Sequence, residues 1–166
     1  EGARQVMENS NSKLIITRPT TTVGSDHGYL PGNIDQKLAP WLQPIYDSIS
    51  KSQEYSSKKN KFRPKIEIAP LAYMRGRTFD NSWIIADEMQ NATPEQTKML
   101  LTRLGQNSTL VLTGDLQQCD IEESGLNDFV ERYERYEDSK YISVIQLDTD
   151  DIVRHDAVKE VLDIYS

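Results

Sequence analysis

Short apolar segments alternate along this chain with longer stretches whose apolar residues recur at helical spacing. The segment at residues 83–86 contains no polar residue, which is typical of a strand buried on both faces in a parallel sheet. Strands are predicted at residues 14–17, 66–69, 83–86, 109–112 and 142–145. Because strands alternate with helices, the pattern predicts an α/β/α sandwich on a mostly parallel sheet.

The helical stretches differ in how clearly their ends are marked. The clearest helix is predicted to begin at Thr93 as N-cap, with Pro94 in the first turn and Gln96 completing a capping box. It is predicted to end at Gly105, with Leu104 on its apolar face. Further helices are predicted in residues 1–9, in 33–49 as two short helices or a kinked one, from about 125 to 133, and near 158–165.

The main candidates for catalytic residues are two adjacent carboxylates, Asp87 and Glu88, which directly follow the apolar segment at 83–86. Open α/β sheets bind ligands at the carboxyl ends of their strands. Consecutive residues of an extended chain point to opposite sides, so one carboxylate can face hydrated Mg²⁺ and the other a water beside a phosphate. This pattern indicates the Walker B strand of an NTP hydrolase. The alternative is a surface acidic pair that closes a core strand.

Composition narrows the function classes. The 166 residues predict one domain, and no apolar run approaches a membrane span. The single cysteine, Cys119, excludes an internal disulfide framework and fits a reducing, cytoplasmic compartment. A net charge of −7 argues against a basic nucleic-acid platform. Residues 50–65 are lysine-rich and predict a mobile basic loop, for which contact with nucleic acid is the alternative interpretation.

The most specific motif in the chain is IEIAPLAYMRGRT at Ile66–Thr78. Together with several other motifs, it resembles the PhoH family of P-loop ATPases over most of the chain. Asp87–Asn91 resembles the Walker B motif of that family, with Met89 where alanine is usual. The other matching stretches are residues 16–19, 28–32, 101–105, 113–118 and 151–155.

The resemblance implies a RecA-like nucleotide-binding core, related to superfamily 1 helicase motor domains, that binds ATP and Mg²⁺. It also implies a homo-oligomeric ring, with a hexamer as the candidate size and RNA as a candidate partner. By resemblance, Asp87 would hold Mg²⁺ through water and Glu88 would act as general base. Gln90 or Gln118 would sense the γ-phosphate.

The remaining candidates are mostly arginines, each of which equally suits a surface or structural role. Arg18, Arg77 and Asp115 are the candidates for contact with the nucleotide phosphates. Arg103 and Arg154 are the candidates for an arginine finger, which a neighbouring subunit would insert to stabilise the transferring phosphoryl group.

The sequence departs from the family at one point: no GxxxxGK(S/T) motif occurs in it. The family places this P-loop just before the residue at which the chain begins. We therefore expect residues 1–166 to be the C-terminal portion of an ATPase domain, without the P-loop strand and helix start. The missing strand would lie between residues 110–112 and 142–145.

Two other functions stay open. A truncated or degenerate P-loop module would bind or assemble without hydrolysis. A Mg²⁺-dependent phosphohydrolase or nuclease would gather three or more acidic ligands, for which Asp87, Glu88, Asp115 and Asp120 are the candidates.

Overall fold

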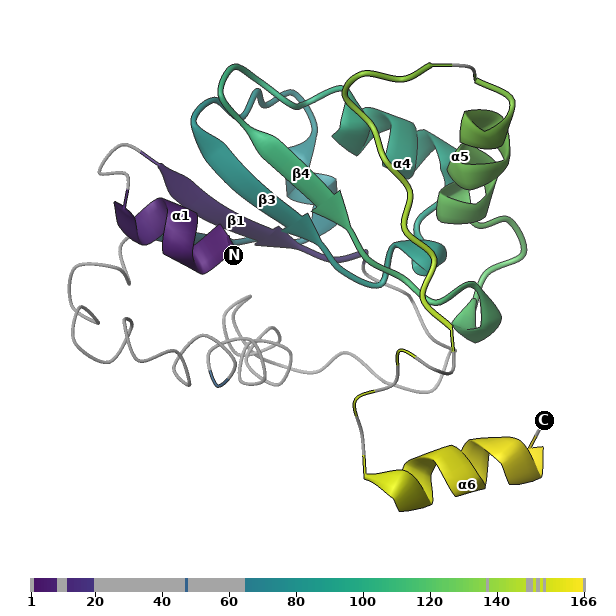
Figure 1. Ribbon diagram of the computed structural model, residues 1–166. Helices are drawn as coiled ribbons and strands as arrows, with labels where there is room; N and C mark the ends of the chain where they lie inside the picture. The colour runs from purple at the N-terminus through teal and green to yellow at the C-terminus, as the bar shows by residue number, and fades with distance from the viewer. Residues whose placement is uncertain are drawn as a thin grey trace, which may run out of the picture. The chain divides into compact units, whose positions relative to one another are not determined.

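The computed structural model shows an α/β protein (Figure 1). It describes residues 2–8, 12–19, 47, 65–136, 138–148, 151, 153 and 155–165. The chain divides into two compact units, Glu1–Glu131 and Arg132–Ser166. The helices predicted within 33–49 and the basic loop predicted at 50–65 lie outside the described residues, apart from Asp47 and Lys65.

The first unit is built on a sheet whose strands all run parallel. Its strands are β1 (Lys13–Thr17), β2 (Ile66–Ile68), β3 (Ser82–Ala86) and β4 (Thr109–Leu112), in the order β2-β1-β3-β4. Figure 1 shows β3 between β1 and β4. Leu14 of β1 pairs with both Ile66 and Trp83, which places β1 inside the sheet. The α/β fold and these predicted strands are therefore confirmed.

Helix α1 (Gly2–Glu8) covers one face of the sheet. Val6 is buried against Leu14 and Ile16 of β1, and Trp83 of β3 packs against the same cluster. The approach is close at Gly2, since a β-carbon there would lie 2.5 Å from Cδ1 of Trp83. The helix predicted in residues 1–9 is thus confirmed as a covering layer.

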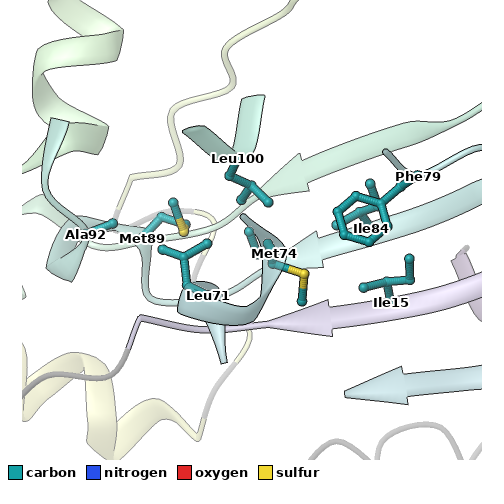
Figure 2. Close-up of a cluster of buried hydrophobic side chains, with 9 residues drawn as sticks. Ile15, Leu71, Met74, Phe79, Ile84, Met89, Ala92 and Leu100 are labelled. Carbon is teal, nitrogen blue, oxygen red and sulfur yellow. The ribbon is translucent and has the colours of Figure 1, made fainter. Parts of the chain in front are cut away.

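The opposite face of the sheet carries the larger core. It is covered by the 3₁₀ segments η2 (Leu71–Met74) and η3 (Met89–Asn91) and by helix α4 (Pro94–Leu101). Figure 2 shows Ile15 of β1 and Ile84 of β3 on the same side of the sheet as Leu71 and Met74. The cluster is formed by Ile15, Leu71, Met74, Phe79, Ile84, Ala86, Met89, Ala92 and Leu100. Helical layers on both faces bury β1, as its apolar residues predict, whereas Thr109 and Val111 of β4 are exposed.

The start of α4 follows the prediction, and its end does not. Thr93 Oγ1 accepts a hydrogen bond from the Gln96 N–H (3.3 Å), and Gln96 Oε1 accepts one from the Thr93 N–H (3.0 Å). The helix ends at Leu101 and does not continue to Gly105. Beyond Leu101 the chain pairs with residue 79: the Phe79 N–H donates to Arg103 O (3.0 Å), and the Gly105 N–H donates to Phe79 O (2.9 Å). Leu104 is consequently 44% exposed and does not belong to the apolar stripe.

The strand predicted at residues 142–145 is wrong. Residues 142–148 have no regular secondary structure, and Ile145 and Leu147 are 81% and 72% exposed. A strand requires a hydrogen-bonded neighbour, and no described residue pairs with this segment. The helices predicted from about 125 to 133 and near 158–165 are confirmed as α5 (Gly125–Glu134) and α6 (Asp156–Tyr165). Among the described residues, no helix combines the length and apolarity needed to cross a bilayer.

Candidate functional site

The carboxyl ends of three strands are joined by backbone hydrogen bonds. The Asp87 N–H, after β3, donates to the carbonyl of Thr17 at the end of β1 (2.9 Å). The Thr113 N–H, after β4, donates to Ala86 O (2.8 Å), and the Met89 N–H donates back to Thr113 O (2.9 Å). The polar residues that follow β1, β3 and β4 therefore share one edge of the sheet, where α/β folds bind ligands.

Asp87 is half-buried at this edge and is oriented by its neighbour on β4. The Thr113 hydroxyl donates to Asp87 Oδ1 at 2.7 Å. A carboxylate oxygen is the hard ligand that Mg²⁺ prefers, and Mg²⁺ needs only one or two protein carboxylates because it keeps several waters. The donor set therefore fits Mg²⁺ held through its water shell.

The acidic residues do not gather as the phosphohydrolase alternative requires. Within the described part of the chain, no group of three or more His, Cys, Asp or Glu side chains is placed to hold a metal. Asp120 is instead bonded to Asn91, whose Nδ2 donates to Asp120 Oδ2 at 3.3 Å. Asp115 caps the short 3₁₀ segment η4 (Leu116–Gln118), since its Oδ1 accepts from the Gln117 N–H at 2.9 Å.

Glu88 has a left-handed backbone conformation, with φ 54° and ψ 38°. Such values are uncommon outside glycine and cost of the order of 1–3 kcal/mol unless the surroundings impose them. The alternation expected of an extended chain therefore does not reach Glu88. Its carboxylate is held from two directions: Oε1 lies 3.7 Å from Arg18 Nη2, and Oε2 accepts from Gln90 Nε2 at 2.6 Å.

Gln90 also belongs to this part of the structure, but its side chain is buried, and the residue is only 1% exposed. Its Nε2 also donates to the Gln118 carbonyl (3.4 Å), and its Oε1 accepts from the Asp115 N–H (3.2 Å). The Gln118 side chain is exposed and donates to Asp115 Oδ2 at 2.8 Å. One connected network thus joins the residues after β3 to those after β4.

The structure does not bring the other arginine candidates to this edge. Arg77 forms an ion pair with Glu67 (2.6 Å) and lies over the ring of Phe79, 4.6 Å from its centroid. Arg103 follows α4, where its carbonyl accepts from the Phe79 N–H ahead of β3 (3.0 Å), at the amino end of the strands. Its guanidinium donates to Arg77 O (3.5 Å). Arg154 lies outside the described residues.

Sequence reasoning did not single out Thr113 as a partner of Asp87. A register argument could have found it, because Ala86 of β3 pairs with Leu112 of β4 and the next residue on each strand is Asp87 or Thr113. The bond from Gln90 to Glu88 had no comparable signal, because it forms across a left-handed turn.

Known proteins are similar in sequence to this chain over most or all of its length. A family model described as PhoH-like protein matches residues 1–166, so it covers both compact units. The chain is 38% identical over 169 residues to Protein PhoH of Escherichia coli (strain K12), covering 100% of this chain and 48% of that protein. It is 41% identical over 155 residues to a PhoH-like protein of Bacillus subtilis (strain 168), covering 92% and 48%.

A third relative gives the same picture. The chain is 42% identical over 164 residues to a PhoH-like protein of Mycobacterium tuberculosis (strain ATCC 25618 / H37Rv), covering 93% of this chain and 44% of that protein. The chain therefore spans about half the length of the curated relatives it matches.

Proposed function

The chain belongs to the PhoH family, and from that premise we propose that it supplies the acidic side of the active site of a Mg²⁺-dependent ATPase. The observation that supports this most directly is the joined edge after β1, β3 and β4. Two adjacent carboxylates stand there, one oriented by a threonine and the other by an arginine and an amide. P-loop NTPases place their metal-holding and water-activating groups in this way.

In the proposed reaction, Asp87 would hold Mg²⁺ through water, and Thr113 would keep the carboxylate in place. Bound Mg²⁺ would supply neutralisation of the charge on the β- and γ-phosphates. Glu88 would accept a proton from the attacking water as the oxygen of that water bonds to the γ-phosphorus and the bond to ADP breaks.

Other residues of the edge would contact the phosphates. Arg18 lies beside Glu88, so its guanidinium would address the γ-phosphate that the water attacks. Gln118 is exposed, whereas Gln90 is buried, which favours Gln118 as the γ-phosphate sensor. Asp115 would act by holding the Gln118 amide.

Arg77 and Arg103 lie away from this edge, so either arginine would contact a phosphate only in the site of a neighbouring copy. That requirement fits the proposed ring, in which an arginine finger from one subunit completes the site of the next. Arg154 stays a second candidate for the finger. A hexameric ring and RNA as a partner remain part of the proposal through family membership alone.

The test is ATP hydrolysis by the full-length gene product, with Glu88→Gln as the variant. Replacing the general base should lower kcat by about 10²–10⁴-fold. Binding of a fluorescent ATP analogue should stay within about threefold, because Gln keeps the shape and loses only the basic oxygen.

The matched control is Glu134→Gln, the same replacement at an exposed residue of α5. Unchanged hydrolysis in Glu88→Gln would contradict the assignment of the base. Nucleotide binding without hydrolysis in the wild-type protein would favour the non-hydrolysing module instead.

A further inference from the structure

The geometry points to Gln90 as a positioning residue that holds the Glu88 carboxylate and ties it to the loop after β4, residues 113–118. The assignment rests on the proposed ATPase, because it says how the proposed base of that site is oriented. It separates the roles of the two glutamines: Gln118 faces the ligand, and Gln90 acts through Glu88.

The amide of Gln90 has no group left for a ligand. Nε2 donates both to Glu88 Oε2 (2.6 Å) and to Gln118 O (3.4 Å), and Oε1 accepts from the Asp115 N–H (3.2 Å). The side chain is 1% exposed. A primary amide has two donor hydrogens and one acceptor oxygen, and each has a partner here. Gln90 therefore does not reach a phosphate while these bonds hold.

The surroundings of the amide are shaped to receive it. A β-carbon at Gly114 would lie 2.7 Å from Gln90 Oε1 and 3.0 Å from Gln90 N, both closer than ordinary contact. Only glycine at this position lets the chain after β4 approach near enough for the Asp115 bond. The thiol of half-buried Cys119, 3.3 Å from Gln90 O, adds a second contact between the same two segments.

The network makes the loop after β4 and the proposed base move together. Glu88 occupies a left-handed turn, so its side chain depends on outside contacts for its direction. One contact comes from Arg18 and the shorter one from Gln90. A ligand that pulls on Gln118 or Asp115 would shift the Gln90 amide, and the amide would shift the Glu88 carboxylate. Phosphate contact at the loop would thereby set the activity of the base.

This role differs from simple structural support. The groups that Gln90 binds belong to half-exposed Glu88 and to exposed Asp115 and Gln118. Water can replace the lost partner of an exposed group, so removal of the amide should cost orientation more than stability. Orientation matters to rate, since a misplacement of about 1 Å in an active site can cost about 10²-fold.

The test is Gln90→Met in the full-length protein with Mg²⁺-ATP. Methionine is unbranched and of similar volume, but it cannot make the three hydrogen bonds. We expect kcat to fall by about 10–100-fold while KM and the Kd of a fluorescent ATP analogue stay within about threefold. The thermal midpoint, measured alongside, should stay close to that of the wild type. Gln106→Met, the same replacement at an exposed glutamine ahead of β4, is the control and should retain the wild-type rate.

The same substitution made in the Glu88→Gln variant tests whether Gln90 acts through Glu88. In single-turnover assays, Glu88→Gln with Gln90→Met should be no slower than Glu88→Gln alone, because the base is already lost. An equal fold-loss in both backgrounds, or an unchanged kcat in Gln90→Met alone, overturns the inference.

If Gln90→Met does not fold, Gly114→Ala displaces the same amide from the other side. It should show the same selective loss of kcat, and that loss should vanish in the Glu88→Gln background. A wild-type protein that never hydrolyses ATP overturns the proposed function as well. Hydrolysis by the wild type with an unaffected Gln90→Met overturns only the role of Gln90.

Discussion

At the scale of single residues, the candidate site depends on hydrogen bonds that cross from one strand end to the next. Thr113 fixes one oxygen of Asp87, and Gln90 fixes one oxygen of Glu88. The donor is a neutral group in both cases, and the second oxygen of Glu88 lies 3.7 Å from Arg18 Nη2. The carboxylates are therefore oriented before any ligand arrives, which is the condition for efficient charge stabilisation.

Removing the Thr113 hydroxyl, which donates to Asp87, should lower the affinity for Mg²⁺ more than it lowers kcat. We expect Thr113→Val to raise the Mg²⁺ concentration for half-maximal ATP hydrolysis by about 10-fold, since the loss of partners that orient metal ligands typically costs about 10–100-fold in affinity. At saturating Mg²⁺, kcat should recover. The measurement is a Mg²⁺ titration of the rate, with Thr109→Val, an exposed threonine of β4, as control. A lower kcat with an unchanged Mg²⁺ requirement would contradict this role.

The two carboxylates were predictable from sequence, whereas the contact between Gln90 and Glu88 was not. Asp87 and Glu88 stand out because an apolar segment stops at them. Gln90 gives no such signal, since a glutamine after a strand predicts an exposed side chain, whereas here it is buried. Its burial depends on Gly114, which lies on a different strand end. Such tertiary contacts have no local pattern.

At the scale of elements, signals within one segment predicted well. The capping box of α4 is a contact between residues three apart, so the sequence contains both partners. The end of α4 was missed because residues 103–105 pair with Phe79, a contact between separate segments that the apolar spacing does not reveal. The strand predicted at 142–145 does not form, because a strand depends on a hydrogen-bonded neighbour and not on its own residues alone.

The cap of α4 should contribute measurably to stability. We expect Thr93→Ala to lower the free energy of unfolding by about 1 kcal/mol, because the Gln96 N–H loses its acceptor. For a chain of this size the thermal midpoint should fall by about 2–4 °C. Lys98→Ala, at an exposed position of the same helix, should leave the midpoint nearly unchanged. Equal shifts in the two variants would show that the cap contributes nothing specific.

At the scale of the whole first unit, a buried apolar cluster lies on each face of the sheet, around the inner strands β1 and β3. The α1 face contributes a small cluster, and the face under η2 and α4 contributes the larger one. The order of the strands could not be read from the chain, because it depends on which connections cross the sheet. Sequence therefore predicted the layers, and the structure supplied their arrangement.

Replacing Leu100 or Leu104 by alanine should have different effects on stability, because only Leu100 belongs to the core. Leu100 is fully buried, and Leu104, beyond the end of α4, is 44% exposed. We expect Leu100→Ala to lower the free energy of unfolding by about 2–5 kcal/mol through the cavity it leaves. Leu104→Ala should cost about 0.5 kcal/mol or less. Urea denaturation of both variants tests this, and comparable losses would contradict the observed end of the apolar stripe.

The position of β1 also decides how the sheet can assemble. Both neighbours of β1 lie far along the chain, since Leu14 pairs with Ile66 and with Trp83. β3 and β4, in contrast, are joined through α4 and can meet early. Closing a long loop costs entropy before its contacts form, which slows folding more than it lowers final stability. We therefore expect β1, one of the two inner strands, to pair later than β3 and β4 do with each other.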